Sequence, residues 1–166
     1  YCVNSSPKRQ GMSNMPHNVN ALGQPKAKRC FYLPNPPALP PDWQCEQPGS
    51  LDSLIALNGN HWRKILVIMA KICAPGPQWR PYLNLLLKHN EQIRFGAAQL
   101  SPYAREHFIC GQQSAIALGL QPLTQPQQFS HQTLTAGQVY CLPYLDYRQC
   151  PNALIESLRQ QLTQFD

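Results

Sequence analysis

HFIC-G-QQSAIALGL, residues 107–120, decides the fold of this chain. The apolar run HFIC predicts a strand, Gly111 a turn, and the segment 112–120 an amphipathic helix. The pattern recurs as a strand over Val139–Leu142, a loop over Pro143–Pro151 and a helix over Asn152–Phe165. Strands that alternate with helices favour a parallel sheet covered by helices. In such sheets the loops at the carboxyl ends of the strands form the binding surface.

Further elements are predicted upstream of this stretch. Trp62–Cys73 is the clearest helix, because its apolar residues recur at the spacing of one helical face. A strand over Arg29–Leu33 must end at Pro34, since proline cannot donate to a ladder. The other predicted elements are helices over 50–57, 79–88 and 101–106, a strand over 92–97 and a surface loop over 121–132.

These elements predict one domain over residues 29–166, an α/β fold of the three-layer α/β/α sandwich type with a small, mainly parallel central sheet. Residues 1–28 show no hydrophobic period and are expected to form a disordered basic arm. Five of the six net positive charges lie within residues 1–30, which contain no acidic residue. A basic arm can hold phosphate by counterion release, and it can equally be a solvated tail.

The cysteine pattern points to a reducing compartment. The chain has seven cysteines, an odd number, and none of them forms a C-x-x-C pair. Free thiols inside apolar segments behave as small hydrophobic side chains. We therefore expect a cytoplasmic protein without disulfides. The histidine and carboxylate spacings favour no metal site, no cofactor is expected, and the longest apolar stretch is too short to span a bilayer.

Three segments fall where a parallel sheet would place its binding loops, at 33–37, 110–113 and 142–149. The first reads Leu-Pro-Asn-Pro-Pro, and a helix opening with Asn60-His61-Trp62-Arg63 follows it. Phe-Ile-Cys-Gly precedes the helix at 112, and the last strand enters a loop that ends in Tyr147-Arg148. In this order the motifs resemble the uracil-DNA glycosylase superfamily, nearest to its mismatch-specific branch, over roughly residues 29–166.

The resemblance implies a DNA-binding protein that takes a damaged base out of the duplex and hydrolyses its N-glycosidic bond. Asn35 would be the catalytic residue that positions the attacking water. Pro143, Tyr144 and Leu145 would wedge into the duplex, a task suited to apolar and aromatic side chains. The other residues that would bind DNA or substrate are Pro36, Gly111, Gln112, Ser114 and Arg148.

Two departures from the family pattern bear on catalysis. Leu142 stands where the family has a His or Asn that donates to the departing base, and such donors contribute roughly 3–4 kcal/mol. Pro34 and Pro37 stand where glycines let the backbone approach the ligand. The resemblance is therefore compatible with weak or lost activity. The alternatives are a non-catalytic bacterial accessory protein on the same fold, and a small-ligand binder that uses the crevice at the strand ends.

Several of these residues have a second interpretation. Asn35 between prolines is typical of a turn. Tyr144, Tyr147 and Arg148 can stack on bases or simply cover the sheet edge. Cys110 can be a thiol activated by the following helix or a small core residue.

Overall fold

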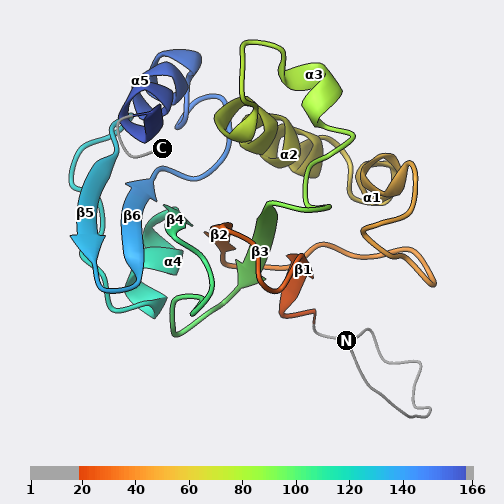
Figure 1. Ribbon diagram of the computed structural model, residues 1–166, viewed down its shortest axis with the longest axis horizontal. Coiled ribbons are helices and arrows are strands. Elements are labelled where there is room, and N and C mark those ends of the chain that lie inside the picture. The colour runs from red at the N-terminus through yellow and green to blue at the C-terminus, as the bar shows by residue number, and fades with distance from the viewer. Residues whose placement is uncertain (1–18, 164–166) are drawn as a thin grey trace.

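A computed structural model describes residues 19–163 of the chain as a sheet flanked by helices (Figure 1). The strands are β1 (Ala21–Gly23), β2 (Arg29–Leu33), β3 (Glu91–Phe95), β4 (Glu106–Cys110), β5 (Ser130–Leu134) and β6 (Gly137–Leu142). The helices are α1 (Ser50–Asn58), α2 (Asn60–Cys73), α3 (Trp79–Tyr82), α4 (Gln112–Ala117) and α5 (Asn152–Thr163). The α/β class expected from the alternating pattern is confirmed.

The six strands form one sheet in the order β1-β3-β2-β4-β6-β5. The four inner strands run parallel, and the two edge strands, β1 and β5, are antiparallel to their neighbours. The sheet is thus mixed, where we predicted a mainly parallel one. The prediction missed β5, which forms a hairpin with β6, and β1, which pairs with β3.

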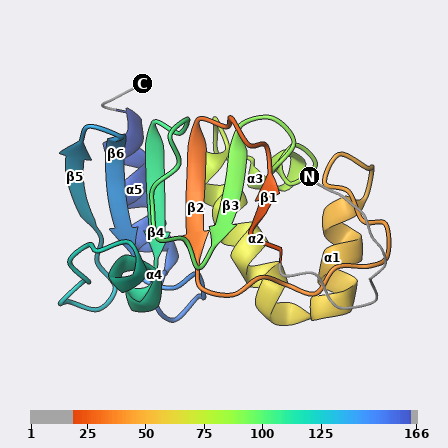
Figure 2. The same ribbon diagram turned by 90° about the horizontal axis from the view of Figure 1, so that it is seen from below.

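Side chains of the inner strands alternate between two apolar layers. Phe31, Phe108 and Tyr140 stack in a row on one face, with ring centroids 4.6 and 5.4 Å apart. This face packs against α2 and α5 (Figure 1). On the other face Tyr32 and Ile109 belong to a smaller cluster under α4, which lies in front of the sheet in Figure 2. Both faces of the sheet are therefore covered, unequally.

The apolar periodicity placed the main helices correctly. The predicted strand at 29–33 and the helices near 50–57, 62–73 and 152–165 appear with small shifts at their ends, residues 164–166 lying outside the described residues. α2 ends at Cys73, because Ala74 is extended and precedes Pro75. α4 stops at Ala117, three residues before its predicted end, because Gly119 takes a positive φ of 73°.

The helix predicted over 79–88 forms only over Trp79–Tyr82. Three further predictions about the elements were wrong. No helix forms over 101–106, where the chain bends and then enters β4 at Glu106. The predicted loop over 121–132 contains the start of β5. The arm expected to be disordered over 1–28 contributes β1, whose Leu22 is buried, so the expectation fails for residues 19–28; its first eighteen residues lie outside the described part.

Every cysteine within residues 19–163 is a free, buried thiol. Burial raises the pKa of Cys30, Cys45 and Cys150 to about 12. Cys110 is 1% exposed, and burial raises its pKa well above the ordinary value. The alternative of an activated thiol at Cys110 is therefore wrong, and this residue is part of the core.

Candidate functional site

The carboxyl ends of three neighbouring strands meet at one edge of the sheet. β2, β4 and β6 are parallel and adjacent, and Cys110 lies opposite Leu142 in register. The amide of Gly111 continues this ladder by donating to the Leu142 carbonyl at 2.9 Å. The loops after β2, β4 and β6 therefore leave the sheet side by side, at the lower edge in Figure 2. We call this the carboxyl edge.

A cavity of about 280 Å³ opens at this edge between α4 and the loop after β6. Its floor is apolar and its rim is formed mainly by side-chain amides. The lining residues are Gly111, Gln112, Ala115, Leu123, Thr124, Gln125, Pro126, Gln127, Cys141, Leu142, Pro143, Tyr144, Arg148 and Gln149. No carboxylate belongs to this lining.

The cavity brings together five of the nine predicted site residues: Gly111, Gln112, Pro143, Tyr144 and Arg148. In register these residues follow β4 and β6, the two strands whose ends are directly paired. Of these side chains, Gln112 and Arg148 are exposed. The sequence prediction of a site at the carboxyl edge thus coincides with a real cavity.

Asn35 and Pro36 do not line the cavity. Both are exposed and follow β2, one strand further along the same edge. Their loop is fixed downstream by Asn58, whose side-chain amide donates to the Ala38 carbonyl at 2.7 Å while its oxygen accepts from the Ala38 amide at 2.9 Å. The predicted catalytic residue therefore lies beside the cavity and outside its wall.

Three predicted contact residues are buried. Leu145 is 0% exposed and belongs to the core between the sheet and the helices, so it is not available as a wedge at the surface. Ser114 is 5% exposed, and its hydroxyl has no hydrogen-bond partner among residues 19–163. Pro143 lines the cavity but is also buried. Of the predicted wedge, Tyr144 alone keeps a partly exposed side chain.

Tyr144 is held between α4 and α2. Its hydroxyl lies 2.9 Å from His61 Nε2, and the two rings stack with centroids 5.7 Å apart. A Cβ added to Gly111 would lie 3.4 Å from the Tyr144 ring, and Gly111 has a φ of 93° and a ψ of 163° that side chains rarely adopt. Burial raises the pKa of Tyr144, with Cys110 and Asp146 adding to the effect. The Tyr144 ring is thus a fixed wall of the cavity.

Residues 20–163 of the chain match DUF6942, a family of unknown function. The chain belongs to this family. The match spans all of the strands and helices, from β1 to α5, and with them the whole cavity. No curated protein matches the chain.

Sequence reasoning missed one wall of this family member's cavity and the residue outside the cavity that holds Tyr144. The segment Thr124–Gln127 was read as a surface loop, yet it forms one wall of the cavity. The Gln127 side chain donates to the Arg148 carbonyl at 2.9 Å and joins that segment to the loop after β6. His61, to which the sequence assigned no role, holds Tyr144. The density of glutamines was the visible signal for the first, whereas nothing local to His61 reveals its partner.

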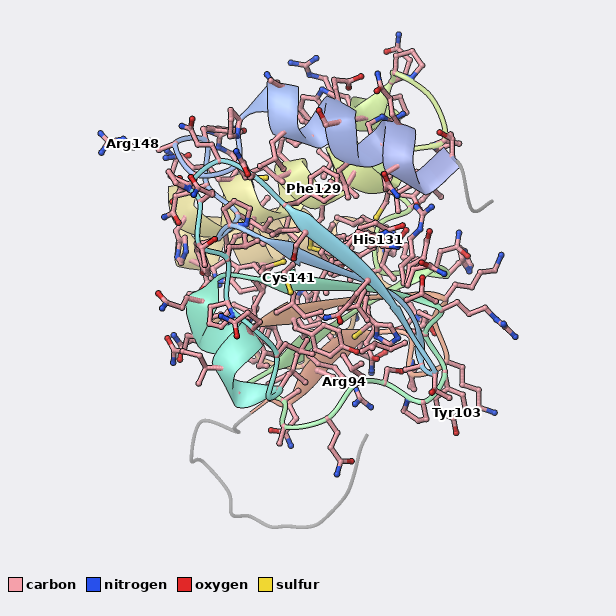
Figure 3. The ribbon with its side chains drawn as sticks, turned by 90° about the vertical axis from the view of Figure 1, so that its left-hand side faces the viewer. Arg94, Tyr103, Phe129, His131, Cys141 and Arg148 are labelled. Carbon is pink, nitrogen blue, oxygen red and sulfur yellow. The ribbon has the colours of Figure 1, made fainter. Side chains whose placement is uncertain are left out.

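The electrostatic character of the cavity is set by one cation and several neutral amides. Arg148 points outward at the same end of the molecule as α4, and Cys141 lies between the strands and that helix (Figure 3). The nearby carboxylate of Asp146 is occupied by the amides of Arg148 and Gln149, at 2.9 and 3.0 Å. The guanidinium of Arg148 itself has no partner among the described residues.

Residues 19–163 hold no group of three or more His, Cys, Asp or Glu side chains suited to a metal ion. Every helix within these residues falls short of the length and hydrophobicity of a membrane span. The arrangement can therefore supply hydrogen-bonding amides, one aromatic wall and one positive charge, set over an apolar floor.

Proposed function

We propose that the protein binds DNA at the carboxyl edge and receives a single everted base in the cavity between α4 and the loop after β6. The observation that carries this proposal is the composition of the cavity wall. Four glutamines and one arginine surround an apolar floor, with the Tyr144 ring on one side and no carboxylate. Side-chain amides match the donor and acceptor edges of a nucleobase, as in the bidentate pairing of Gln with adenine.

The size of the cavity favours a small heterocycle. Its volume of about 280 Å³ is close to the lower limit of small-molecule pockets, which is about 300 Å³. A base with part of its sugar suits this space better than a dinucleotide. Tyr144 offers a ring on which a base can stack, and Arg148 at the rim suits the adjoining phosphate.

The finer description of the fold belongs to the same proposal. α2 and α5 lie on one face of the sheet and α4 on the other, which supports a three-layer α/β/α arrangement similar to the uracil-DNA glycosylase superfamily. The buried free thiols support a reducing, cytoplasmic location. A role in bacterial DNA repair is implied only by the resemblance to the uracil-DNA glycosylase superfamily.

We propose further that hydrolysis of the N-glycosidic bond is slow or lost. The Leu142 side chain at the position of the family's donor is 1% exposed and apolar. Asn35, the residue that would hold the water, does not line the cavity. Because Leu142 offers no donor and Asn35 lies outside the cavity lining, the role of a non-catalytic accessory protein that recognises a base is the better supported of the two.

Base binding is tested by closing the cavity from its rim. Gln112 and Gln113 are consecutive and both exposed, but only Gln112 lines the cavity. We expect Gln112→Trp to abolish the saturation-transfer NMR signals of free nucleosides, and Gln113→Trp to keep them. Equal signals in both variants, or none in the wild type, would refute the proposed site.

Hydrolysis is tested by incubation with uracil-, hypoxanthine- and mismatch-containing oligonucleotides. We expect binding without abasic product. Accumulation of abasic product in the wild type but not in Asn35→Ala would contradict this expectation and assign Asn35 to catalysis. A neutral small-ligand binder would instead show almost no dependence of oligonucleotide affinity on salt.

A further inference from the structure

A row of cations and aromatic rings starts beside the cavity and runs along the exposed side of α2. Lys64 and Lys71 lie two helical turns apart on one face of α2, and both ammonium groups sit near the Tyr147 ring, at 5.8 and 5.4 Å. Lys71 is also 5.4 Å from the Trp79 ring, and Arg80 is 4.5 Å from it. We call Lys64, Tyr147, Lys71, Trp79 and Arg80 the cation–aromatic stripe.

The stripe is continuous with the cavity at one end and hollowed at the other. Tyr147 is 39% exposed and precedes Arg148, which lines the cavity. At the far end a second cavity of about 220 Å³ has Lys71, Trp79 and Asn152 among its lining residues. The Asn152 side chain accepts from Lys71 at 3.1 Å. Glu156, the acidic residue of that lining, has a side chain that is 71% exposed and lies 3.9 Å from Arg159.

We infer that the cation–aromatic stripe binds single-stranded nucleic acid, with bases stacked on Tyr147 and Trp79 and phosphates on Lys64 and Lys71. The repeating unit of a single strand is one planar base and one negative charge. The stripe matches this unit twice, with Lys64 beside the Tyr147 ring and Lys71 beside the Trp79 ring. In a duplex the bases are hidden in the stack, so the rings would find nothing to stack on.

Binding requires the lysines to exchange their contacts with the rings for contacts with phosphates, while Lys71 also has the Asn152 side chain as a partner. Each ammonium group now rests over a ring at the surface, and such exposed cation–π contacts are weak. Base–aromatic stacking is the stronger interaction, and a phosphate is a better partner for a lysine than a ring. The exchange is therefore favourable. An acidic peptide would engage the cations and leave both rings without a partner.

This inference rests on the proposed function, because the strand on the stripe is the one whose base would enter the cavity. It adds that the segment leading to the cavity is single-stranded. It also gives Tyr147 a task distinct from that of Tyr144, whose hydroxyl is engaged by His61.

The test is fluorescence anisotropy with a labelled oligothymidylate, a duplex of the same length and an abasic oligomer of equal charge. We expect the oligothymidylate to bind the wild type most tightly. Tyr147→Ala should weaken its binding about tenfold, whereas Tyr147→Phe should retain it because the ring remains. Lys64→Gln should reduce the slope of log affinity against log salt by about 0.7.

The chain offers a matched control at the opposite edge of the sheet. Lys26 lies 5.7 Å from the ring of Tyr103, which is 52% exposed, and Figure 3 shows Tyr103 far from Arg148. Tyr103→Ala should leave oligothymidylate affinity unchanged. Circular dichroism of each variant would show that the fold is retained.

The outcomes separate this inference from the proposed function. If Gln112→Trp abolishes nucleoside binding while Tyr147→Ala binds oligothymidylate like the wild type, the stripe is overturned and the cavity proposal stands. If the stripe variants weaken binding while nucleosides never bind, the cavity proposal fails and the stripe stands as the binding surface. Equal affinity for the abasic oligomer and the oligothymidylate would show charge alone and would overturn the stripe.

Discussion

The two ends of the parallel strands differ in how their polar side chains are satisfied. At the amino edge, Arg29 opens β2 between Glu91 of β3 and Glu106 of β4. Its guanidinium donates to Glu106 at 2.6 Å and to the Cys73 carbonyl at 3.2 Å. At the carboxyl edge, the guanidinium of Arg148 has no partner within residues 19–163.

Two further groups complete the amino edge. Arg159 of α5 donates to the carbonyls of Lys71, Ala74 and Gly76, and so binds the end of α2 and the residues that follow it. Glu91 is 0% exposed and accepts from the Tyr82 hydroxyl and the Leu87 amide. Arg29, Arg159 and Glu91 are thus committed to the fold, whereas the carboxyl edge keeps the Arg148 guanidinium available for a ligand.

The largest effect is expected from Arg29→Met. Removing the guanidinium leaves the Glu106 carboxylate, whose side chain is 13% exposed, without its partner. We expect the free energy of unfolding to fall by about 3 kcal/mol. Urea denaturation followed by circular dichroism measures this loss. Arg148→Met is the control, expected within about 0.5 kcal/mol of the wild type. Similar losses in both variants would erase the contrast between the edges.

Gly111→Ala should have the next largest effect. The residue has a backbone conformation that is almost restricted to glycine, and a Cβ there would come into contact with the Tyr144 ring at 3.4 Å. We expect a loss of about 2 kcal/mol in the free energy of unfolding. Gly119→Ala, where a Cβ would meet open space at a φ of 73°, should lose about 1 kcal/mol. The same urea titration compares them, and an equal loss would mean that the Gly111 conformation costs a side chain no more than the Gly119 conformation.

A smaller, pH-dependent effect is expected at Glu91. Burial raises the pKa of its carboxyl above the ordinary value of 4.5, although Tyr82 and Leu87 partly oppose the shift. Between 4.5 and the raised pKa, the folded chain holds a proton at Glu91 that the unfolded chain has lost. The stability contributed by this residue is therefore complete below pH 4.5 and is lost as the pH rises through the raised pKa.

Glu91→Gln should remove this part of the pH dependence. The amide keeps the shape of the protonated acid and does not titrate. We expect the difference in the free energy of unfolding between variant and wild type to shift in favour of the variant as the pH rises above 4.5. Comparing the two proteins at each pH cancels the other titrating groups. A constant difference across this range would rule out a raised pKa at Glu91.

The smallest effect on stability, and the clearest on binding, is expected from Arg148→Ala. The side chain is exposed, so unfolding should change by less than about 0.5 kcal/mol. The slope of log affinity against log salt for a single-stranded oligonucleotide should fall by about 0.7. Arg63→Ala is a suitable comparison, because Arg63 is also exposed but its side chain is engaged by Asn60 at 2.7 Å.

The inner strands and main helices could be predicted from the sequence because their buried positions recur at regular spacing and are filled by apolar residues. Phe31 and Phe108 lie on strands that are buried on both faces. β5 could not be read in this way, since its burial pattern has no buried residue, and β1 is three residues long. Edge strands have one neighbour and need less apolar surface.

The false helix at 101–106 shows how a correct local signal can mislead. The Ser101 hydroxyl accepts from the amides of Tyr103 and Ala104, at 3.2 and 3.3 Å, as a helix cap would. The Arg105 amide then bonds to the Lys28 carbonyl, and the chain enters β4 instead of a helix. The conformation of this segment is therefore set by Lys28, a pairing partner distant in sequence. The contact between His61 and Tyr144 likewise joins residues that are far apart in the sequence.

The buried thiols make the chain its own stability probe. Cys30, Cys73 and Cys110 are at most 4% exposed, and burial raises the pKa of each. Alkylating reagents attack the thiolate, so these groups should react when the surrounding structure opens. Mass spectrometry after timed alkylation would therefore rank how often the layer beneath α4 (Cys30), the end of α2 (Cys73) and the carboxyl end of β4 (Cys110) become transiently accessible, with no introduced label.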